Sequence, residues 1–370
     1  MNKYDVAAYI WPAYTGDEPR TRIFWEEGIG EWQTVKNSKP KQNGYYWNRK
    51  PLWGYVNEAD PYIMSMQINA AADHGVNVFI YDWYWYDNRP FLENCLNDGF
   101  LKSPNRNRMK FYIMWANHDA NTLWDIRNSD HVDETIWSGQ VNREQFEIIG
   151  KRWIEKYFTV DNYYKIDNKP VVSIYSLQNL IDGLGGVEEC CDAIEWLDNE
   201  AKKSGLDGVH FQAIRWNGFT GNLTGVDGGA KKTENDVLVK LGFDSVTHYQ
   251  YVHFADVKRN YEEITLDAEK EWENVSKVYT IPYYPHVSVG WDNNPRFREY
   301  DDNIVKNNTP ENIEKAMLAA RDFADGNGVN LITVNSWNEW TETSYLQPDN
   351  VNGYGYLEAI KKVFCNDNSK

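Results

Sequence analysis

Short apolar runs rich in β-branched and aromatic residues recur along the chain, and each is followed by a stretch with helical periodicity. This alternation is typical of βα units around a parallel sheet. Eight such units close a (β/α)8 barrel. The pattern therefore predicts an α/β fold, a single TIM barrel domain over residues 1–370 with no interdomain linker. The eight expected strands are residues 6–11, 76–83, 110–116, 170–176, 209–216, 245–251, 278–283 and 330–337.

Helix start signals lie between these runs. Asp60-Pro61 and Thr309-Pro310 each place a capping side chain before a proline at the first helical position. Periodic apolar residues follow both signals. The stretches 142–158 and 186–204 are predicted as amphipathic helices, and 255–277 as a long charged helix.

The expected connections differ in length on the two sides of the barrel. Helix-to-strand links are short, at residues 74–75, 241–242 and 326–328, whereas strand-to-helix links are long, at 12–59, 117–141, 217–234 and 284–308. Loops of such length are uncommon unless they build a functional site. We therefore expect the strand-to-helix loops to form the active-site face.

Composition and charge limit the classes of partner that this chain is expected to bind. The net charge is -17, which repels phosphate backbones and anionic lipid surfaces, so we expect neither nucleic acid nor a membrane as partner. No apolar run approaches the roughly 20 residues that span a bilayer. The chain opens without a leader pattern, which predicts a cytoplasmic protein, or a periplasmic or secreted one if a leader was removed.

Motifs for metals, nucleotides and nucleophilic side chains are not found. The sequence contains no HExxH, GxGxxG, phosphate-binding GxxxxGK[ST] or GxSxG pattern, so no metal and no cofactor are expected. The four cysteines are too few and too unevenly placed for a disulfide framework, which favours free thiols.

The expected strand ends carry aromatic residues interleaved with Asn, Asp, His and Glu. This mixture suits a sugar, whose C–H face stacks on rings and whose hydroxyls need polar partners. The alternative is that the aromatics are strand formers that fill the core. For Trp83, Trp85, Trp115 and Trp291 we expect at least two rings exposed in the cleft. The substrate-binding candidates at strand ends are Tyr9, Trp11, Asp82, Trp83, Trp85, Trp115, Asn117, His118, Tyr175, Trp216, His248, Tyr249, Tyr283, Trp291, Asp292, Trp337 and Asn338.

The catalytic candidates are Glu339 and Glu342, at the end of the eighth expected strand. Where a strand turns into a helical turn, side chains three apart share one side, about 5–6 Å from each other. Two carboxyls at that separation suit retaining glycoside chemistry, and their repulsion should raise one pKa so that this group serves as the acid. The alternative is an acidic loop that faces solvent.

Three segments resemble the glycoside hydrolase family 99-like group, relatives of endo-α-mannosidases that also include proteins described as glycosyltransferases. These segments span nearly the whole chain in order. The resemblance adds Glu31 and Trp32 as substrate-binding candidates. The segments are Gly30-Glu31-Trp32 with Val35-Lys36-Asn37-Ser38-Lys39-Pro40, Trp115-Ala116-Asn117, and Gly290-Trp291-Asp292-Asn293-Asn294-Pro295-Arg296 joined to Trp337-Asn338-Glu339-Trp340-Thr341-Glu342.

The resemblance implies a retaining glycoside hydrolase without a catalytic metal that acts on α-linked, α-mannoside-like glycans or polysaccharides. It gives Glu339 the role of the base on the sugar 2-hydroxyl, which attacks C1 to form a 1,2-anhydro sugar. Glu342 would protonate the leaving oxygen and then activate water. One difference is that the endomannosidases have a further carboxylate near the third strand end, where this chain has Asn117, His118 and Asp119.

Two alternatives remain. One is a glycosyltransferase of polysaccharide synthesis, against which the acidic chain and the missing nucleotide motif argue. The other is a carbohydrate-binding barrel without catalysis, which any turnover of an α-glycoside would exclude. An oligosaccharide or polysaccharide is the expected partner in every case.

Overall fold

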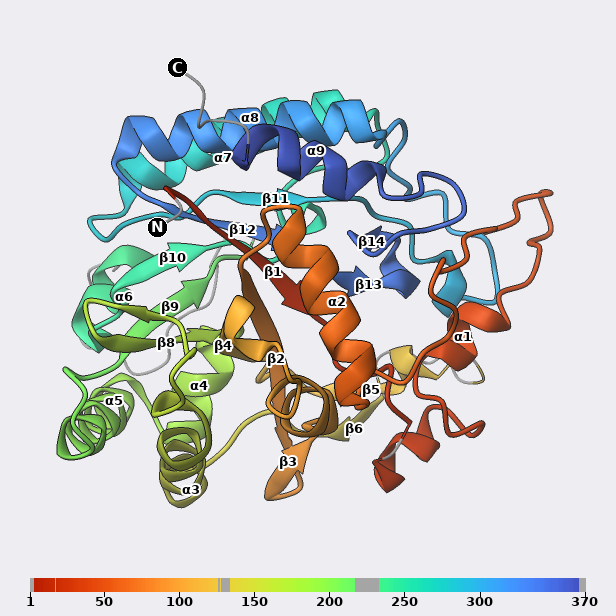
Figure 1. Ribbon diagram of the computed structural model, residues 1–370. Coiled ribbons are helices and arrows are strands. Elements are labelled where there is room, and N and C mark those ends of the chain that lie inside the picture. Colours follow the sequence, from red (N-terminus) through yellow and green to blue (C-terminus); the bar gives the residue numbers. More distant parts are fainter. Residues whose placement is uncertain (1–2, 17, 126, 128–133, 217–232, 366–370) are drawn as a thin grey trace.

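The computed structural model describes residues 3–16, 18–125, 127, 134–216 and 233–365 (Figure 1). Eight parallel strands form a nearly closed barrel in the order β10-β9-β8-β4-β2-β1-β12-β11, and a single bridge between Val246 and Tyr283 joins its two ends. The predicted TIM barrel is thereby confirmed. The barrel strands are β1 (Asp5–Ile10), β2 (Val78–Tyr86), β4 (Lys110–Trp115), β8 (Lys169–Ile174), β9 (His210–Ile214), β10 (Ser245–Thr247), β11 (His286–Ser288) and β12 (Leu331–Asn335).

Helices surround the barrel, as the alternation predicted. The Asp60 carboxylate accepts from the backbone N–H groups of Tyr62 and Ile63, and the Thr309 hydroxyl accepts from Asn312, so both expected caps are present. The expected helix 142–158 is confirmed as α3 followed by a π-helical turn, Ile154–Phe158. The helices are α1 (Trp32–Lys36), α2 (Pro61–Asp73), α3 (Arg143–Trp153), α4 (Leu177–Leu184), α5 (Val187–Lys203), α6 (Glu234–Leu241), α7 (Tyr261–Val278), α8 (Pro310–Asn327) and α9 (Gly355–Phe364).

Short strand pairs decorate the loops. Two of these strands pair with barrel strands and the other four pair with one another, and every pair is antiparallel. The short strands are β3 (Arg89–Phe91), β5 (Ala120–Asn121), β6 (Thr135–Trp137), β7 (Lys165–Ile166), β13 (Asn338–Glu339) and β14 (Ser344–Tyr345).

The prediction of a seventh strand at residues 278–283 is wrong. Helix α7 continues to Val278, and the Tyr279 N–H still donates to the Val275 carbonyl. Tyr283 makes only its single bridge to Val246, and the strand proper is β11. Pro282 and Pro285 have no N–H to donate, which keeps this apolar run out of a regular ladder. The expected helix 255–277 likewise begins only at Tyr261.

The predicted loop asymmetry is present among the described residues. The connection from β1 to α2 covers some fifty positions and contains α1, whereas α2 and β2 are separated by residues 74–77 only. The expected loop 217–234 lies almost wholly outside the described residues.

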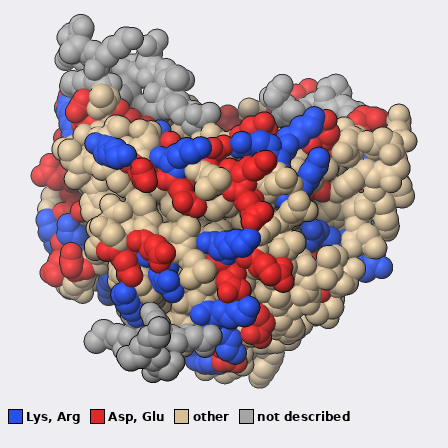
Figure 2. Space-filling model, turned by 90° about the horizontal axis from the view of Figure 1, so that it is seen from above, with Lys and Arg blue, Asp and Glu red and all other residues tan. Residues whose placement is uncertain are grey.

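The face over α7, α8 and α9 mixes both charge signs, with red and blue side chains next to one another in Figure 2. Lys315 of α8 pairs with Glu262 of α7 at 2.6 Å, and Lys362 of α9 pairs with Glu314 of α8 at 2.9 Å. This face is therefore an ordinary solvated helix surface. In the described part of the chain, no helix combines the length and apolar character that crossing a bilayer requires. The four cysteines are free, with Cys95 and Cys190 buried.

Candidate active site

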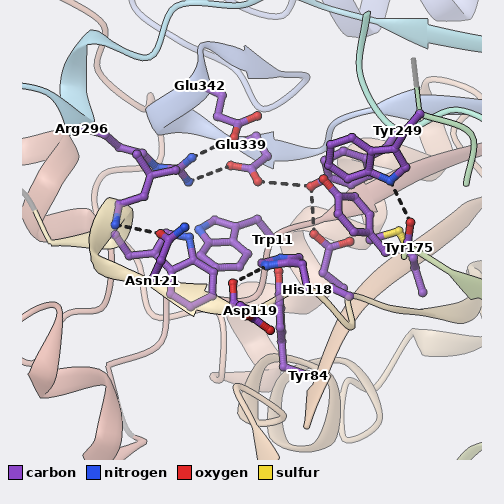
Figure 3. A pocket seen from close by; sticks show the side chains of 16 residues that line it. Trp11, Tyr84, His118, Asp119, Asn121, Tyr175, Tyr249, Arg296, Glu339 and Glu342 are labelled. Carbon is purple, nitrogen blue, oxygen red and sulfur yellow. Dashed lines mark hydrogen bonds and ion pairs between the residues drawn. The ribbon is translucent and has the colours of Figure 1, made fainter. Parts of the chain in front are cut away.

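A cavity of about 370 Å³ opens at the carboxyl end of the barrel (Figure 3). Each barrel strand contributes a lining residue from its carboxyl-terminal half or from the loop that follows it, which is where TIM barrels place their active sites. We refer to this cavity as the cleft. Its lining residues are Trp11, Asp82, Tyr84, Met114, Ala116, His118, Asp119, Asn121, Leu123, Trp124, Tyr175, Trp216, Tyr249, Arg296, Glu339 and Glu342.

A tight hairpin carries the two glutamates into the cleft. Strands β13 and β14 pair antiparallel, and a 3₁₀ turn, Trp340–Glu342, joins them. In a 3₁₀ turn residues three apart lie on the same side, so Glu339 and Glu342 face the cleft together. The ring of Trp340 stacks on Tyr345 with centroids 3.8 Å apart, which packs the turn against strand β14.

One guanidinium links the two glutamates. Arg296 Nη1 donates to Glu342 Oε1 at 2.8 Å, and Nη2 lies 3.5 Å from Glu339 Oε2. On its other side Arg296 Nε donates to Glu31 Oε1 at 2.9 Å. Arg296 and Glu31 are both buried. A single cation therefore serves three carboxylates at the base of the cleft.

Glu31 is itself held in place by three contacts. It accepts from Trp11 Nε1 at 2.5 Å and from Thr341 Oγ1 at 3.0 Å. Its backbone N–H donates to the Ala13 carbonyl at 3.0 Å. The preceding Gly30 has φ +60°, and a Cβ there would lie 1.8 Å from the Ala13 oxygen, so only glycine allows this close approach.

The pKa values of both glutamates in the cleft are raised. Burial, and next the charge of Glu342, raise the pKa of Glu339 well above its usual range, while Arg296 opposes the shift. Burial also raises the pKa of Glu342, again against Arg296. The pair therefore tends to keep a proton where isolated carboxylates would lose theirs.

Asp82, from β2, is another carboxyl in the cleft lining. Burial raises its pKa well above the usual range. The Tyr249 hydroxyl lies 3.0 Å from Asp82 Oδ2 and 3.3 Å from Glu339 Oε1, so one phenol proton connects the two groups (Figure 3). Asp82 Oδ1 and Glu342 Oε2 are buried and make no hydrogen bond to any described residue.

A family model described as Glycosyltransferase WbsX matches residues 6–360. The chain belongs to this WbsX family. Among curated proteins, the chain is 23% identical over 365 residues to the uncharacterized protein WxcX of two strains of Xanthomonas campestris pv. campestris. The match covers 93% of this chain and 47% of WxcX, so the chain spans about half the length of these relatives.

Solved structures similar to this WbsX family chain include two glycosidase-like barrels. One is a glycoside hydrolase family 99 endo-α-mannosidase from Bacteroides thetaiotaomicron, with a TM-score of 0.61 and 12% identity over 98% of this chain and 96% of that one. The other is a glycoside hydrolase-like protein, with a TM-score of 0.60 and 14% identity over 98% and 94%. The expected resemblance to the family 99-like group is confirmed, and the shared property at these identities is the fold.

The cleft of this WbsX family member collects eight of the residues predicted from the sequence. Two more stand directly behind it: Glu31 on Arg296, and Asn338, whose amide donates to the Trp11 carbonyl at 2.9 Å and to Glu58 at 2.8 Å. The eight in the lining are Trp11, Asp82, His118, Tyr175, Trp216, Tyr249, Glu339 and Glu342.

The structure does not bring the expected stacking platforms into the cleft. Alternation along β2 and β4 sends Trp83, Trp85 and Trp115 outward, because Asp82, Tyr84 and Met114 take the inward positions. Each outward ring is buried. Trp83 donates to Glu93 at 2.9 Å, Trp85 donates to Gln145 of α3 at 3.2 Å, and Trp115 packs on Trp153 at 5.6 Å.

Other predicted residues are also outside the lining. Trp291 is half-buried against the core, so none of the four expected platforms lines the cleft. Trp32 packs on Tyr14, and Trp337 donates to Gln67 of α2 at 2.8 Å. For Trp32 and Trp337 the reading of aromatics as core filling is therefore the correct one.

Three predicted residues form the polar floor beneath the cleft. His248 Nδ1 lies 2.7 Å from the Tyr283 hydroxyl, and Tyr9 donates to the His248 carbonyl at 3.1 Å. Burial lowers the pKa of His248 well below its usual value. These side chains therefore support the barrel interior as neutral groups and do not line the cleft.

Two of the predicted polar residues, Asn117 and Asp292, form hydrogen bonds that connect loop segments. Asn117 accepts from the Ser176 N–H at 2.7 Å and donates to its carbonyl at 2.8 Å, which joins the ends of the third and fourth barrel strands. Asp292 accepts from the Tyr45 hydroxyl and from Asn294. Both side chains are satisfied by the protein itself.

Several lining residues were not among the sequence candidates. Tyr84 follows from Asp82 by strand alternation, and Arg296 ends one of the segments that carry the family resemblance, so both had a signal. Trp124 had none beyond the length of its loop, since loop length does not indicate which side chain folds over the barrel mouth. The unpredicted lining residues are Tyr84, Met114, Ala116, Asp119, Asn121, Leu123, Trp124 and Arg296.

Replacing Arg296 with Gln is expected to move the pH profile of turnover to higher pH. Arg296 lowers the pKa of both Glu339 and Glu342, so its removal lets both values rise, and the singly protonated pair then exists at higher pH. The measurement is kcat/KM against pH. Arg259→Gln, a surface change beside Asp267, is the control and should leave the profile in place. An unchanged or acid-shifted profile for Arg296→Gln would contradict the conclusion that Arg296 lowers the pKa values of the pair.

Proposed function

We propose that this chain is a retaining glycoside hydrolase for α-linked, α-mannoside-like glycans. One observation supports it above the others. Glu339 and Glu342 face the same cleft from one 3₁₀ turn and share the guanidinium of Arg296, with Glu339 buried and the Glu342 side chain 13% exposed. Six rings beside them, those of Trp11, Tyr84, Trp124, Tyr175, Trp216 and Tyr249, supply the aromatic surface that a sugar ring requires.

The proposed reaction runs in two inverting steps, which together retain the anomeric configuration. Glu339 removes the proton of the 2-hydroxyl as that oxygen attacks C1, and Glu342 gives its proton to the departing oxygen. The product of this step is a 1,2-anhydro sugar. Glu342, now a carboxylate, takes a proton from water as the water attacks C1, and Glu339 returns its proton to O2.

The charge of the cleft supports a neutral sugar at the reacting centre. Four carboxyl groups line the cleft, on Asp82, Asp119, Glu339 and Glu342, against one guanidinium that Glu31 already compensates. A sugar-nucleotide diphosphate would be repelled by this arrangement. A glycosyltransferase is the second candidate, because the family description names that activity.

The test is a panel of aryl α-glycosides and α-linked oligosaccharides in manno and neighbouring configurations. Hydrolysis with release of the α-anomer, followed by ¹H NMR, is the expected result. A parallel panel pairs sugar nucleotides with hydroxyl acceptors. Turnover confined to the second panel would overturn the hydrolase in favour of the transferase, and binding without turnover in either would leave a carbohydrate-binding barrel. The Glu339→Gln/Glu342→Gln double variant is the control for contaminating activity.

A further inference from the structure

A second cavity, of about 430 Å³, is lined by residues adjacent in sequence to cleft residues, and its described charged lining residues are all cations. Four of its lining residues are cations, and none of the described lining residues is acidic, although the whole chain carries -17. We refer to it as the basic cavity. Its lining residues are Gln33, Thr34, Asn37, Lys39, Pro40, Lys41, Arg127, Phe297 and Arg298.

Neighbouring residues of the same loops line the two cavities. Arg296 lines the cleft, while the next two residues, Phe297 and Arg298, line the basic cavity. Trp124 lines the cleft, and Arg127 of the same loop lines the basic cavity. Helix α1 begins at the Glu31 cap, which contacts Arg296, and α1 places Gln33 and Thr34 on the basic cavity. The basic cavity therefore adjoins the residues that surround Glu339 and Glu342, and an extended ligand bound in the cleft would reach it.

Lys41 is the unusual member of this group. Its residue is only 8% exposed, and its ammonium donates to the carbonyl oxygens of Phe297 and Arg298. No described carboxylate forms an ion pair with it. Burial lowers the pKa of Lys41, while Asp292 and Glu299 oppose this from longer range. A buried lysine is rarely left without a counter-ion, which makes Lys41 the strongest candidate in this cavity for binding an anion.

The remaining cations differ in how far they are neutralised. Arg127 pairs with Asp125 at 2.8 Å and with Glu26, and Arg298 donates to the Arg127 carbonyl. Lys39 is exposed at the rim, and no described acidic group pairs with it. Lys41 and Lys39 are the two lining cations on which the proposal rests, because no described carboxylate forms an ion pair with either.

We propose that the basic cavity binds the carboxylate of an acidic sugar, a hexuronate residue of the same glycan whose scissile bond lies in the cleft. Gln33, Thr34 and Asn37 offer polar groups for its hydroxyls, and Phe297 offers an apolar face. The substrate class is then an acidic polysaccharide with a neutral sugar at the reacting centre. The inference rests on the proposed function only for the claim that cleft and cavity hold one glycan.

The test uses the wild-type chain and free monosaccharides, so it needs no turnover. Glucuronate, galacturonate and mannuronate are each compared with glucose, galactose and mannose by ligand-observed NMR titration at low salt. We expect at least one hexuronate to bind about tenfold more tightly than its hexose, the size of one charge-assisted hydrogen bond. Lys41→Met should abolish this preference, and Lys41→Arg should keep it.

The matched control is Lys270→Met, which removes the same charge from the exposed face of α7 and should change nothing. Thermal melting checks that each variant is folded. The proposal is overturned if no hexuronate is preferred, if Lys41→Met keeps the preference, or if inorganic phosphate binds at least as tightly as every hexuronate, which would indicate a free-anion site. A chain that hydrolyses nothing yet shows the Lys41-dependent preference would refute the proposed function and leave the acidic-sugar site standing.

Discussion

Glu339→Gln is expected to lose about 10⁴-fold in kcat toward every α-glycoside, whatever its leaving group. The proposed attacking oxygen is the sugar 2-hydroxyl, and no departing group can compensate for an attacking oxygen that stays protonated. Glu339 is buried and lies between Tyr249 and Arg296, so the neutral amide fits the same space without its basicity. The measurement is kcat for aryl glycosides whose phenols span several pKa values.

A 2-deoxy-2-fluoro substrate with an activated leaving group distinguishes the 2-hydroxyl route from direct attack by Glu339. If the 2-hydroxyl is the nucleophile, the analogue should bind and remain uncut. Intact-protein mass spectrometry of the wild type then shows no adduct. A sugar mass attached to Glu339 would instead show that this carboxylate attacks C1 directly.

Glu342→Gln is expected to lose about 10²–10⁴-fold on substrates with basic leaving oxygens and much less on activated aryl glycosides. The acid is needed only when the departing oxygen must be protonated to leave. Glu342 lines the cleft and its Oε1 accepts from Arg296, so the proposed acid role falls to Oε2, which has no described partner. The measurement is the slope of log kcat/KM against leaving-group pKa, which should steepen in the variant.

Two controls support this assignment. Glu273→Gln, an exposed change on α7, should match the wild type. Pre-steady-state kinetics separate loss of the acid from loss of the water-activating step, because only the second lets an intermediate accumulate. An equal loss on all leaving groups without accumulation would assign the acid role to another residue.

The local features of the fold could be read from the sequence because each depends on neighbours along the chain. Proline after Asp60 and after Thr309 starts a helix wherever the chain goes next. Glu339 and Glu342 meet because one 3₁₀ turn separates them. The error at the seventh strand has a local origin too, since the run 278–283 fits a strand by composition, but Pro282 within it and Pro285 just after it cannot donate to a ladder.

The direction of the aromatic residues could not be read in the same way. Strand β2 is buried on both sides, with its inner face in the barrel and its outer face under helices. Its sequence therefore has no polar face to indicate which residues point inward. Pairing with β1 and β4 decides that Tyr84 faces the cleft and that Trp83 and Trp85 face α3. Which residues of β2 point inward is therefore decided only when the barrel closes.

By itself, the sequence determined the barrel, its helix caps and the glutamate pair, since hydrophobic period, capping and turn geometry act over a few residues. Only the tertiary structure decided what surrounds that pair. Arg296 reaches Glu31 across 265 positions and Glu339 across 43, and Lys41 reaches Phe297 across 256. Such contacts form when the barrel closes and brings distant loops to one rim, and no local pattern records them.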